Sequence, residues 1–151
     1  MSDGELERSI ASLVEYDDES LIEQLAMRAE ATKTDPRVAG EFAPAVTYDF
    51  EDAGIASDLL ELGGRILRRW ERELHDVLCG SAKEDEKDRA ELRSKLGADD
   101  VVLGAAVATV LMGMGVSAAI AAVLGALILK RILKPGGQEV CKFWTERLDT
   151  R

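Results

Sequence analysis

The sequence predicts an all-α fold, a six- or seven-helix bundle with a central hydrophobic helical hairpin. Apolar residues recur at the spacing of a helix face along most of the chain, and no segment shows the sustained alternation of apolar and polar residues that marks a strand. The 151 residues are 46% hydrophobic. This composition suits one folded domain and excludes a disordered acidic chain.

The N-terminal region predicts two helices followed by a linker. Leucine, isoleucine and valine side chains share one helix face over residues 3–16. Ser20, with Glu23 three residues later, forms a capping-box pattern that opens a second helix. Two prolines and a glycine break helical continuation in residues 33–49, so we expect a loop or linker there.

The middle of the chain carries the clearest amphipathic helix. An apolar stripe runs through residues 59–78, charged residues occupy the opposite face, and Gly80 is placed to end the helix. Ser81 and Glu84 repeat the capping-box pattern. They predict a charged helix over about 82–96.

An uncharged apolar segment, residues 101–129, is the unusual feature of the chain. Asp99 stands before it, where a negative side chain favours the start of a helix. The glycines of Gly113–Met114–Gly115 weaken a helix interior and predict a break between two arms, about 100–112 and 117–133. Each uncharged arm is then too short to cross a bilayer upright.

A turn and a last helix complete the chain. Pro135, Gly136 and Gly137 predict the turn, and a helix follows over about 138–149. We interpret the elements as three regions. These are an N-terminal acidic helical pair (1–32), a linker (33–49) and a helical domain (50–151) that contains the hydrophobic hairpin (99–134).

A helix without a polar face must be buried in protein or in lipid. We therefore expect the large apolar side chains of the hairpin, together with one tryptophan of the last helix, to lie either at a membrane or protein interface or in the core. These residues are Val101, Leu103, Val107, Leu111, Ile120, Leu124, Leu127, Ile128 and Trp144. For Trp70 and Trp144, core anchoring is the favoured interpretation.

Two groups of cations lie near these apolar elements. They are candidates for contact with lipid headgroups or with an acidic partner. The alternative is pairing with the many Asp and Glu residues of the chain itself. The groups are Arg65, Arg68, Arg69 and Arg72 on the amphipathic helix, and Lys130, Arg131 and Lys134 after the hairpin.

In outline, the pattern around residues 99–134 is similar to colicin-type pore-forming domains and to Bcl-2-type bundles. Those families surround a hydrophobic helical hairpin with amphipathic helices and release it into a membrane. The resemblance implies a similar design here. It assigns no role to individual residues.

Charge and the N-terminus set the expected surroundings. The net charge is −10, with −13 on residues 1–100 and +3 on the remainder. An acidic surface repels phosphate, which disfavours nucleic acid as a partner. The N-terminus lacks a basic stretch followed by an apolar run, so we expect a cytoplasmic location, with the inner face of the membrane as an option. Cys79 and Cys141 are then expected to be reduced.

The residues that carry chemistry form no recognisable catalytic or metal pattern. His75 shares a helix face with Glu71 and Cys79, but a structural zinc site needs four ligands, and no paired spacing supplies them. No glycine-rich phosphate loop follows a strand pattern. We expect no metal, no cofactor, no small-molecule substrate and no enzymatic activity.

The sequence therefore favours a non-enzymatic helical protein whose hydrophobic hairpin associates with or inserts into a membrane. The alternative is a soluble helical adaptor or assembly subunit whose hairpin forms the core or a protein interface. Membrane lipid or a partner protein is the expected partner, and a homo-oligomer is a further option.

Overall fold

The computed structural model describes residues 3–44 and 55–149, and these residues are mostly helical, with no strand among them. The all-α prediction is confirmed. In chain order the elements are α1 (Asp3–Leu13), α2 (Asp18–Thr34), η1 (Pro36–Gly40), α3 (Ile55–Cys79), η2 (Lys83–Asp85), α4 (Glu86–Lys95), α5 (Asp100–Gly113), α6 (Ala118–Ile128), η3 (Leu129–Leu133), α7 (Lys134–Gly136), η4 (Gly137–Glu139) and α8 (Val140–Asp149).

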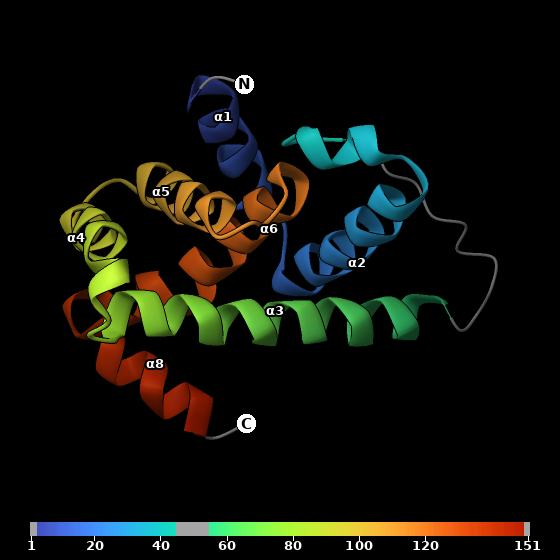
Figure 1. The fold of residues 1–151 in the computed structure, drawn as a ribbon. Helices are drawn as coiled ribbons and strands as arrows, with labels where there is room; N and C mark the ends of the chain where they lie inside the picture. Colours follow the sequence, from blue (N-terminus) through green and yellow to red (C-terminus); the bar gives the residue numbers. More distant parts are fainter. Residues whose placement is uncertain (1–2, 45–54, 150–151) are drawn as a thin grey trace.

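Helix α6 lies in the middle of the molecule, and the long helix α3 runs across the bundle beneath it (Figure 1). α6 contacts α1, α2, α3 and α5. Every α6 residue is buried except Ile120, which is half-buried. A helix surrounded in this way needs no polar face, which explains the uniformly apolar sequence of this element.

The start of α2 differs from the capping box predicted at Ser20. Asp17 is the N-cap residue, and its Oδ1 accepts a 2.7 Å hydrogen bond from the backbone N–H of Ser20. This hydrogen bond lowers the pKa of the Asp17 carboxyl. The capping signal was present in the sequence, but it began three residues earlier because aspartate is an equally good N-cap.

Two features of the middle helices were predicted incompletely. α3 ends at Cys79, directly before Gly80 as predicted, but it begins at Ile55, ahead of the apolar stripe. The capping box predicted at Ser81 is wrong: the chain first forms the short 3₁₀ turn η2, and neither η2 nor α4 has a side-chain capping hydrogen bond.

The predicted break within the apolar segment is confirmed. α5 ends at Gly113, and Gly115 adopts a φ of +101°, a conformation that glycine reaches without strain. Asp99 is the N-cap of α5, as predicted, with its Oδ1 3.4 Å from the backbone nitrogen of Val101. The second arm is not one regular helix, because the α-helical part stops at Ile128 and continues as the π-helical turn η3.

The turn predicted at Pro135–Gly137 is instead largely helical. Pro135 lies in the first turn of α7, where the fixed φ of proline is compatible with a helix. Gly137, with a φ of +54°, redirects the chain into the short 3₁₀ turn η4. α8 then begins at Val140, slightly later than the sequence predicted.

Close contact between α5 and α6 depends on two glycines. A Cβ atom added to Gly125 would lie 2.7 Å from the carbonyl oxygen of Gly104. No side chain fits in that space, so the two backbones can approach only with glycine at this crossing. Trp144 is fully buried in the core cluster, as predicted, whereas Trp70 is half-buried beneath the guanidinium of Arg69.

The N-terminal helices pack onto the rest of the bundle. α1 contacts α5 and α6, and α2 contacts α3 and α6. The division into regions at residues 32 and 49 remains a prediction, and the predicted linker residues 45–49 lie outside the described residues.

Candidate functional site

Most of the residues expected at a membrane or protein interface lie in the core. Val101 and Ile120 are half-buried, and the other residues of this group are buried. The buried ones are Leu103, Val107, Leu111, Leu124, Leu127, Ile128 and Trp144. In this arrangement the protein's own helices cover these side chains, and a partner or a membrane would contact other surfaces first.

The cations that follow α6 are paired within the protein. Arg131 Nε lies 3.3 Å from Glu71 Oε1, and Lys134 Nζ lies 3.1 Å from Asp100 Oδ2. Lys130 donates a hydrogen bond to the carbonyl oxygen of Tyr16 and lies 3.5 Å from the carboxylate of Asp18. These side chains thus tie the end of α6 to α2, α3 and α5.

The arginines of α3 remain at the surface. We define the α3 arginine row as Arg65, Arg68, Arg69 and Arg72. All of them are exposed, and none forms an ion pair with another described residue within 4.0 Å. Arg69 stacks over the neighbouring Trp70, with its Cζ 4.9 Å from the ring centroid. The row is therefore exposed, and its contact with an anionic partner remains a prediction.

A groove follows the outer face of α5, between α1 and α4. We call it the α5 groove; its volume is about 490 Å³. Leu6 of α1 and Val102 and Val110 of α5 supply apolar walls, and small residues form much of the floor. The lining residues of α5 are Val102, Ala105, Ala106, Thr109, Val110 and Gly113.

The groove has an apolar floor and a charged rim. Thr109 donates its hydroxyl to the carbonyl of Ala105 at 2.9 Å, so this polar group is satisfied inside the helix. Charged residues of both signs stand at the edges. They are Glu7 of α1 and Lys87, Asp88, Glu91 and Lys95 of α4.

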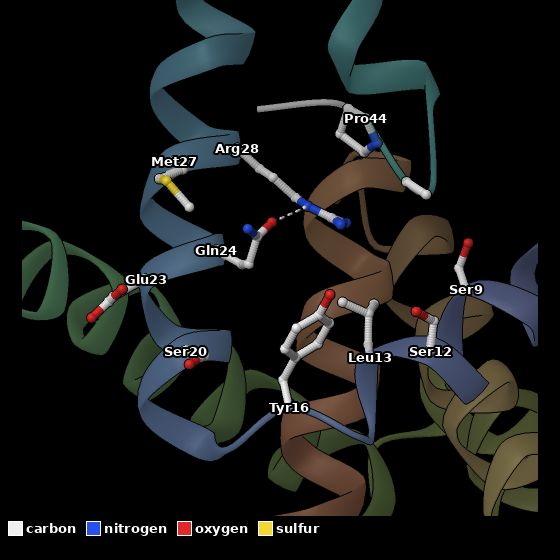
Figure 2. Close-up of a pocket in the computed structure, with 11 residues that line it drawn as sticks. Ser9, Ser12, Leu13, Tyr16, Ser20, Glu23, Gln24, Met27, Arg28 and Pro44 are labelled. Carbon is white, nitrogen blue, oxygen red and sulfur yellow. Dashed lines mark hydrogen bonds between the residues drawn. The ribbon is translucent and has the colours of Figure 1, made fainter. Parts of the chain in front are cut away.

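A second hollow, the Arg28 pocket, has a volume of about 420 Å³ and lies between α1, α2 and the segment after η1 (Figure 2). Arg28 is 4% exposed. Its Nη1 donates to the carbonyl oxygens of Phe42 at 2.8 Å and Ala119 at 2.9 Å, and its Nε donates to Gln24 Oε1 at 3.2 Å. Burial lowers the pKa of the guanidinium to about 10.

Sequence reasoning missed Arg28, although a signal was present. Arg28 continues the helical spacing of the buried Leu21 and Leu25, so it falls on the inward face of α2. A cation in line with buried leucines is unusual, because a charge is costly to bury. This position was therefore a candidate for a special role.

Cys79 and Cys141 form a disulfide bond, so the prediction of reduced thiols is wrong. The bond joins the last residue of α3 to the first turn of α8, and the two Cα atoms lie 5.6 Å apart. This separation is within the range that a disulfide spans. The earlier expectation rested on a cytoplasmic location, where disulfides are rare. That location remains a prediction.

His75 makes structural contacts beside the disulfide. Its Nε2 lies 2.9 Å from the hydroxyl of Thr145, and its ring meets the edge of Trp144 with centroids 5.4 Å apart. Among the described residues, no group of three or more His, Cys, Asp or Glu side chains is arranged to hold a metal ion.

Comparisons with protein-family models, with curated proteins and with solved structures give no match to this chain. Within the part of the chain that the structure describes, no helix combines the length and the apolar character that crossing a bilayer requires. Among the described residues, the α5 groove, the α3 arginine row and the Arg28 pocket offer room or charge to a partner.

Proposed function

We propose that the protein is a non-enzymatic helical adaptor that binds an amphipathic helix of a partner protein in the α5 groove. In this proposal α5 and α6 form a central hydrophobic hairpin that serves as the core of the bundle. The observation that carries the proposal is the apolar floor of the groove, which lies open between the charged edges of α1 and α4.

Burial accounts for the apolar character of α6 without a membrane. Its side chains are packed by α1, α2, α3 and α5, and no polar group within the helix is left to solvate. α5 differs because its outer face is incompletely covered: Val102 and Ala106 are half-buried, and Thr109 is exposed. An apolar strip of this kind, bordered by polar residues, is typical of an interaction surface.

The shape of the groove suits a helix. Small side chains at Ala105, Ala106 and Gly113 allow another backbone to approach α5 closely. Leu6 and Val110 supply walls against which larger apolar side chains of a partner would pack. An amphipathic helix places such side chains at three- and four-residue spacing and inserts them into a hydrophobic groove.

The rim favours a partner helix with charges of both signs beside its apolar stripe. Lys87 and Lys95 of α4 would attract acidic side chains, whereas Glu7 and Glu91 would attract basic ones. Charge pairs at the edge of an interface contribute to specificity and to the rate of association more than to affinity. The apolar floor would supply most of the binding free energy.

The α3 arginine row favours a second candidate, association with an anionic membrane surface. The row is exposed and has no ion-pair partner among the described residues, so its charges are free to meet lipid headgroups. Deeper insertion would require the hairpin to leave the core. That step would break the packing of α6 and the ion pair between Arg131 and Glu71.

Site-specific photo-crosslinking tests the adaptor function. Benzoylphenylalanine is placed at Ala106 on the groove floor, with Ala90 on the exposed surface of α4 as the matched control. After irradiation in the native host, mass spectrometry identifies the crosslinked segment. A synthetic peptide of that segment is then titrated into the wild type and into the Ala106→Arg variant.

The adaptor proposal predicts crosslinks at Ala106 and none at Ala90. The crosslinked peptide should be helical when bound. Its affinity for the Ala106→Arg variant should be at least tenfold lower than its affinity for the wild type. Crosslinks between two copies of this chain would assign the groove to self-association. Equal labelling at both positions would also overturn the proposal.

Flotation on phosphatidylcholine vesicles containing phosphatidylserine tests the second candidate, association with an anionic membrane. The Arg65→Gln and Arg72→Gln variants are expected to bind these vesicles less than the wild type.

A further inference from the structure

The Arg28 pocket contains a buried positive charge that has no acidic counterpart among the described residues. No carboxylate of a described residue lies within 4.0 Å of the Arg28 guanidinium. Its partners are neutral oxygens of Phe42, Ala119 and Gln24. Carbonyl dipoles offset the cost of burying a cation only in part, so the site retains an attraction for a negative group.

One end of the guanidinium is not used by these contacts. Nε and Nη1 donate the hydrogen bonds described above, whereas Nη2 donates to no other described residue. Arg28 is one of the residues that line the pocket. Arg28 thus offers a charged donor to whatever enters.

Hydroxyl groups face the same space. Figure 2 shows the Tyr16 hydroxyl directed toward Gln24 and Arg28, with Ser9 and Ser12 along the α1 side. None of these three hydroxyls donates a hydrogen bond to another described residue. Hydroxyl donors beside a guanidinium form the kind of polar lining that fixes an anionic ligand in a pocket.

We propose that the Arg28 pocket binds a small molecule through an oxyanion group, a carboxylate or a phosphate, which pairs with Arg28 Nη2 and accepts hydrogen bonds from Tyr16 and Ser12. The pocket volume of about 420 Å³ falls within the range of small-molecule sites. The ligand is bound and not converted, because the lining residues include no nucleophile with an adjacent base.

Glu23, the acidic residue of the pocket lining, is not placed to repel an anion bound at Arg28. Glu23 belongs to the pocket wall, but Figure 2 shows its carboxylate on the other side of α2, directed away from Arg28. The remaining polar residues of the wall are neutral. The sequence predicted no small-molecule substrate; the ligand proposed here would be bound without conversion, in a pocket separate from the α5 groove.

Binding would also connect the ligand to the core. Nη1 of Arg28 holds the carbonyl of Ala119 in the first turn of α6 and the carbonyl of Phe42 after η1. An anion on Nη2 would fix the guanidinium that makes both contacts. Ligand binding is therefore expected to raise the resistance of the protein to unfolding.

The experiment is a titration of the full chain with sodium phosphate and, separately, with sodium acetate, each at constant ionic strength adjusted with sodium chloride. Backbone amide chemical shifts around Arg28 and Ser12 and the midpoint of urea unfolding are recorded. Tyr16→Phe and Ser12→Ala remove hydroxyl donors at partly open positions and should leave the fold intact. Ser94→Ala, in α4 and away from the pocket, is the control.

The proposal expects saturable shifts with one of the two oxyanions, weakened at least fivefold by Tyr16→Phe combined with Ser12→Ala and unchanged by Ser94→Ala. Saturation by phosphate or by acetate alone identifies the headgroup. No saturable shift with either oxyanion at constant ionic strength would overturn the proposal. The proposal would also be overturned if the variants that lack the pocket hydroxyls bound the anion as tightly as the wild type. This comparison leaves Arg28 unchanged, so it does not depend on the folding of an Arg28 variant.

Discussion

Arg131 Nε lies 3.3 Å from Glu71 Oε1 and connects the π-helical turn after α6 to the middle of α3. The Glu71 side chain is fully buried, whereas Arg131 is 20% exposed. A carboxylate in the core is costly without a cation beside it, so this pair holds η3 against α3. It also explains why a charge on the apolar face of α3 is tolerated.

Replacing Arg131 with methionine should therefore destabilise the protein strongly. We expect Arg131→Met to lower the free energy of unfolding by about 3 kcal/mol, because the buried Glu71 loses its ion pair with Arg131. Lys134→Met removes the solvent-exposed pair with Asp100 and should cost at most about 1 kcal/mol. Urea unfolding at neutral pH measures both. Equal effects of the two variants would contradict this ranking.

The Cys79–Cys141 disulfide is expected to contribute substantially to stability. It closes a loop with a sequence separation of 62 residues. Chain-entropy arguments give about 4 kcal/mol for a loop of this length. Dithiothreitol should lower the urea midpoint of the wild type and have no effect on the Cys79→Ser/Cys141→Ser variant. Detection of two free thiols in the non-reduced, purified protein would refute the bond itself.

Local signals in the sequence predicted the helices well. The break at Gly113–Gly115 and the end of α3 before Gly80 follow from the backbone preferences of glycine, which act within a few residues. Both capping-box predictions were wrong. Asp17, and not Ser20, is the N-cap of α2, and the short 3₁₀ turn η2 stands where the helix predicted after Ser81 would begin.

Contacts between distant residues were not readable in the same way. The disulfide depends on the meeting of α3 and α8, and the Arg28 pocket depends on carbonyl groups of residues 42 and 119. Backbone acceptors carry no sequence signature, so the partners of Arg28 could not be predicted. Its spacing from Leu21 and Leu25 was the only available signal.

Glycine-to-alanine substitutions test the packing of α5 against α6. Gly125→Ala should cost about 1–3 kcal/mol, because its Cβ would clash with the rigid carbonyl of Gly104. Gly104→Ala should cost less, since the atoms closest to its Cβ would be side-chain methyl groups of Ile10 and Leu129 and not a backbone carbonyl. Gly113→Ala meets nothing within 4 Å and should be neutral or slightly stabilising. A different order in urea unfolding would argue against this helix crossing.

The N-cap of α2 gives a pH-dependent prediction. The hydrogen bond from the Ser20 backbone lowers the pKa of Asp17 below its ordinary value of 3.8. The native state then binds fewer protons than the unfolded state in this range, so the Asp17 contribution is present above pH 3.8 and is lost as the pH falls through the lowered pKa. Asn at this position can cap the helix but cannot titrate there.

Urea unfolding of the wild type and of Asp17→Asn, from about pH 6 to about pH 2, measures this contribution. The wild type should lose more stability than Asp17→Asn as the solution is acidified, and Asp17→Ala should be less stable than Asp17→Asn at every pH because alanine has no acceptor. A constant difference between the wild type and Asp17→Asn over the whole range would show that the carboxylate does not gain from its bond to Ser20.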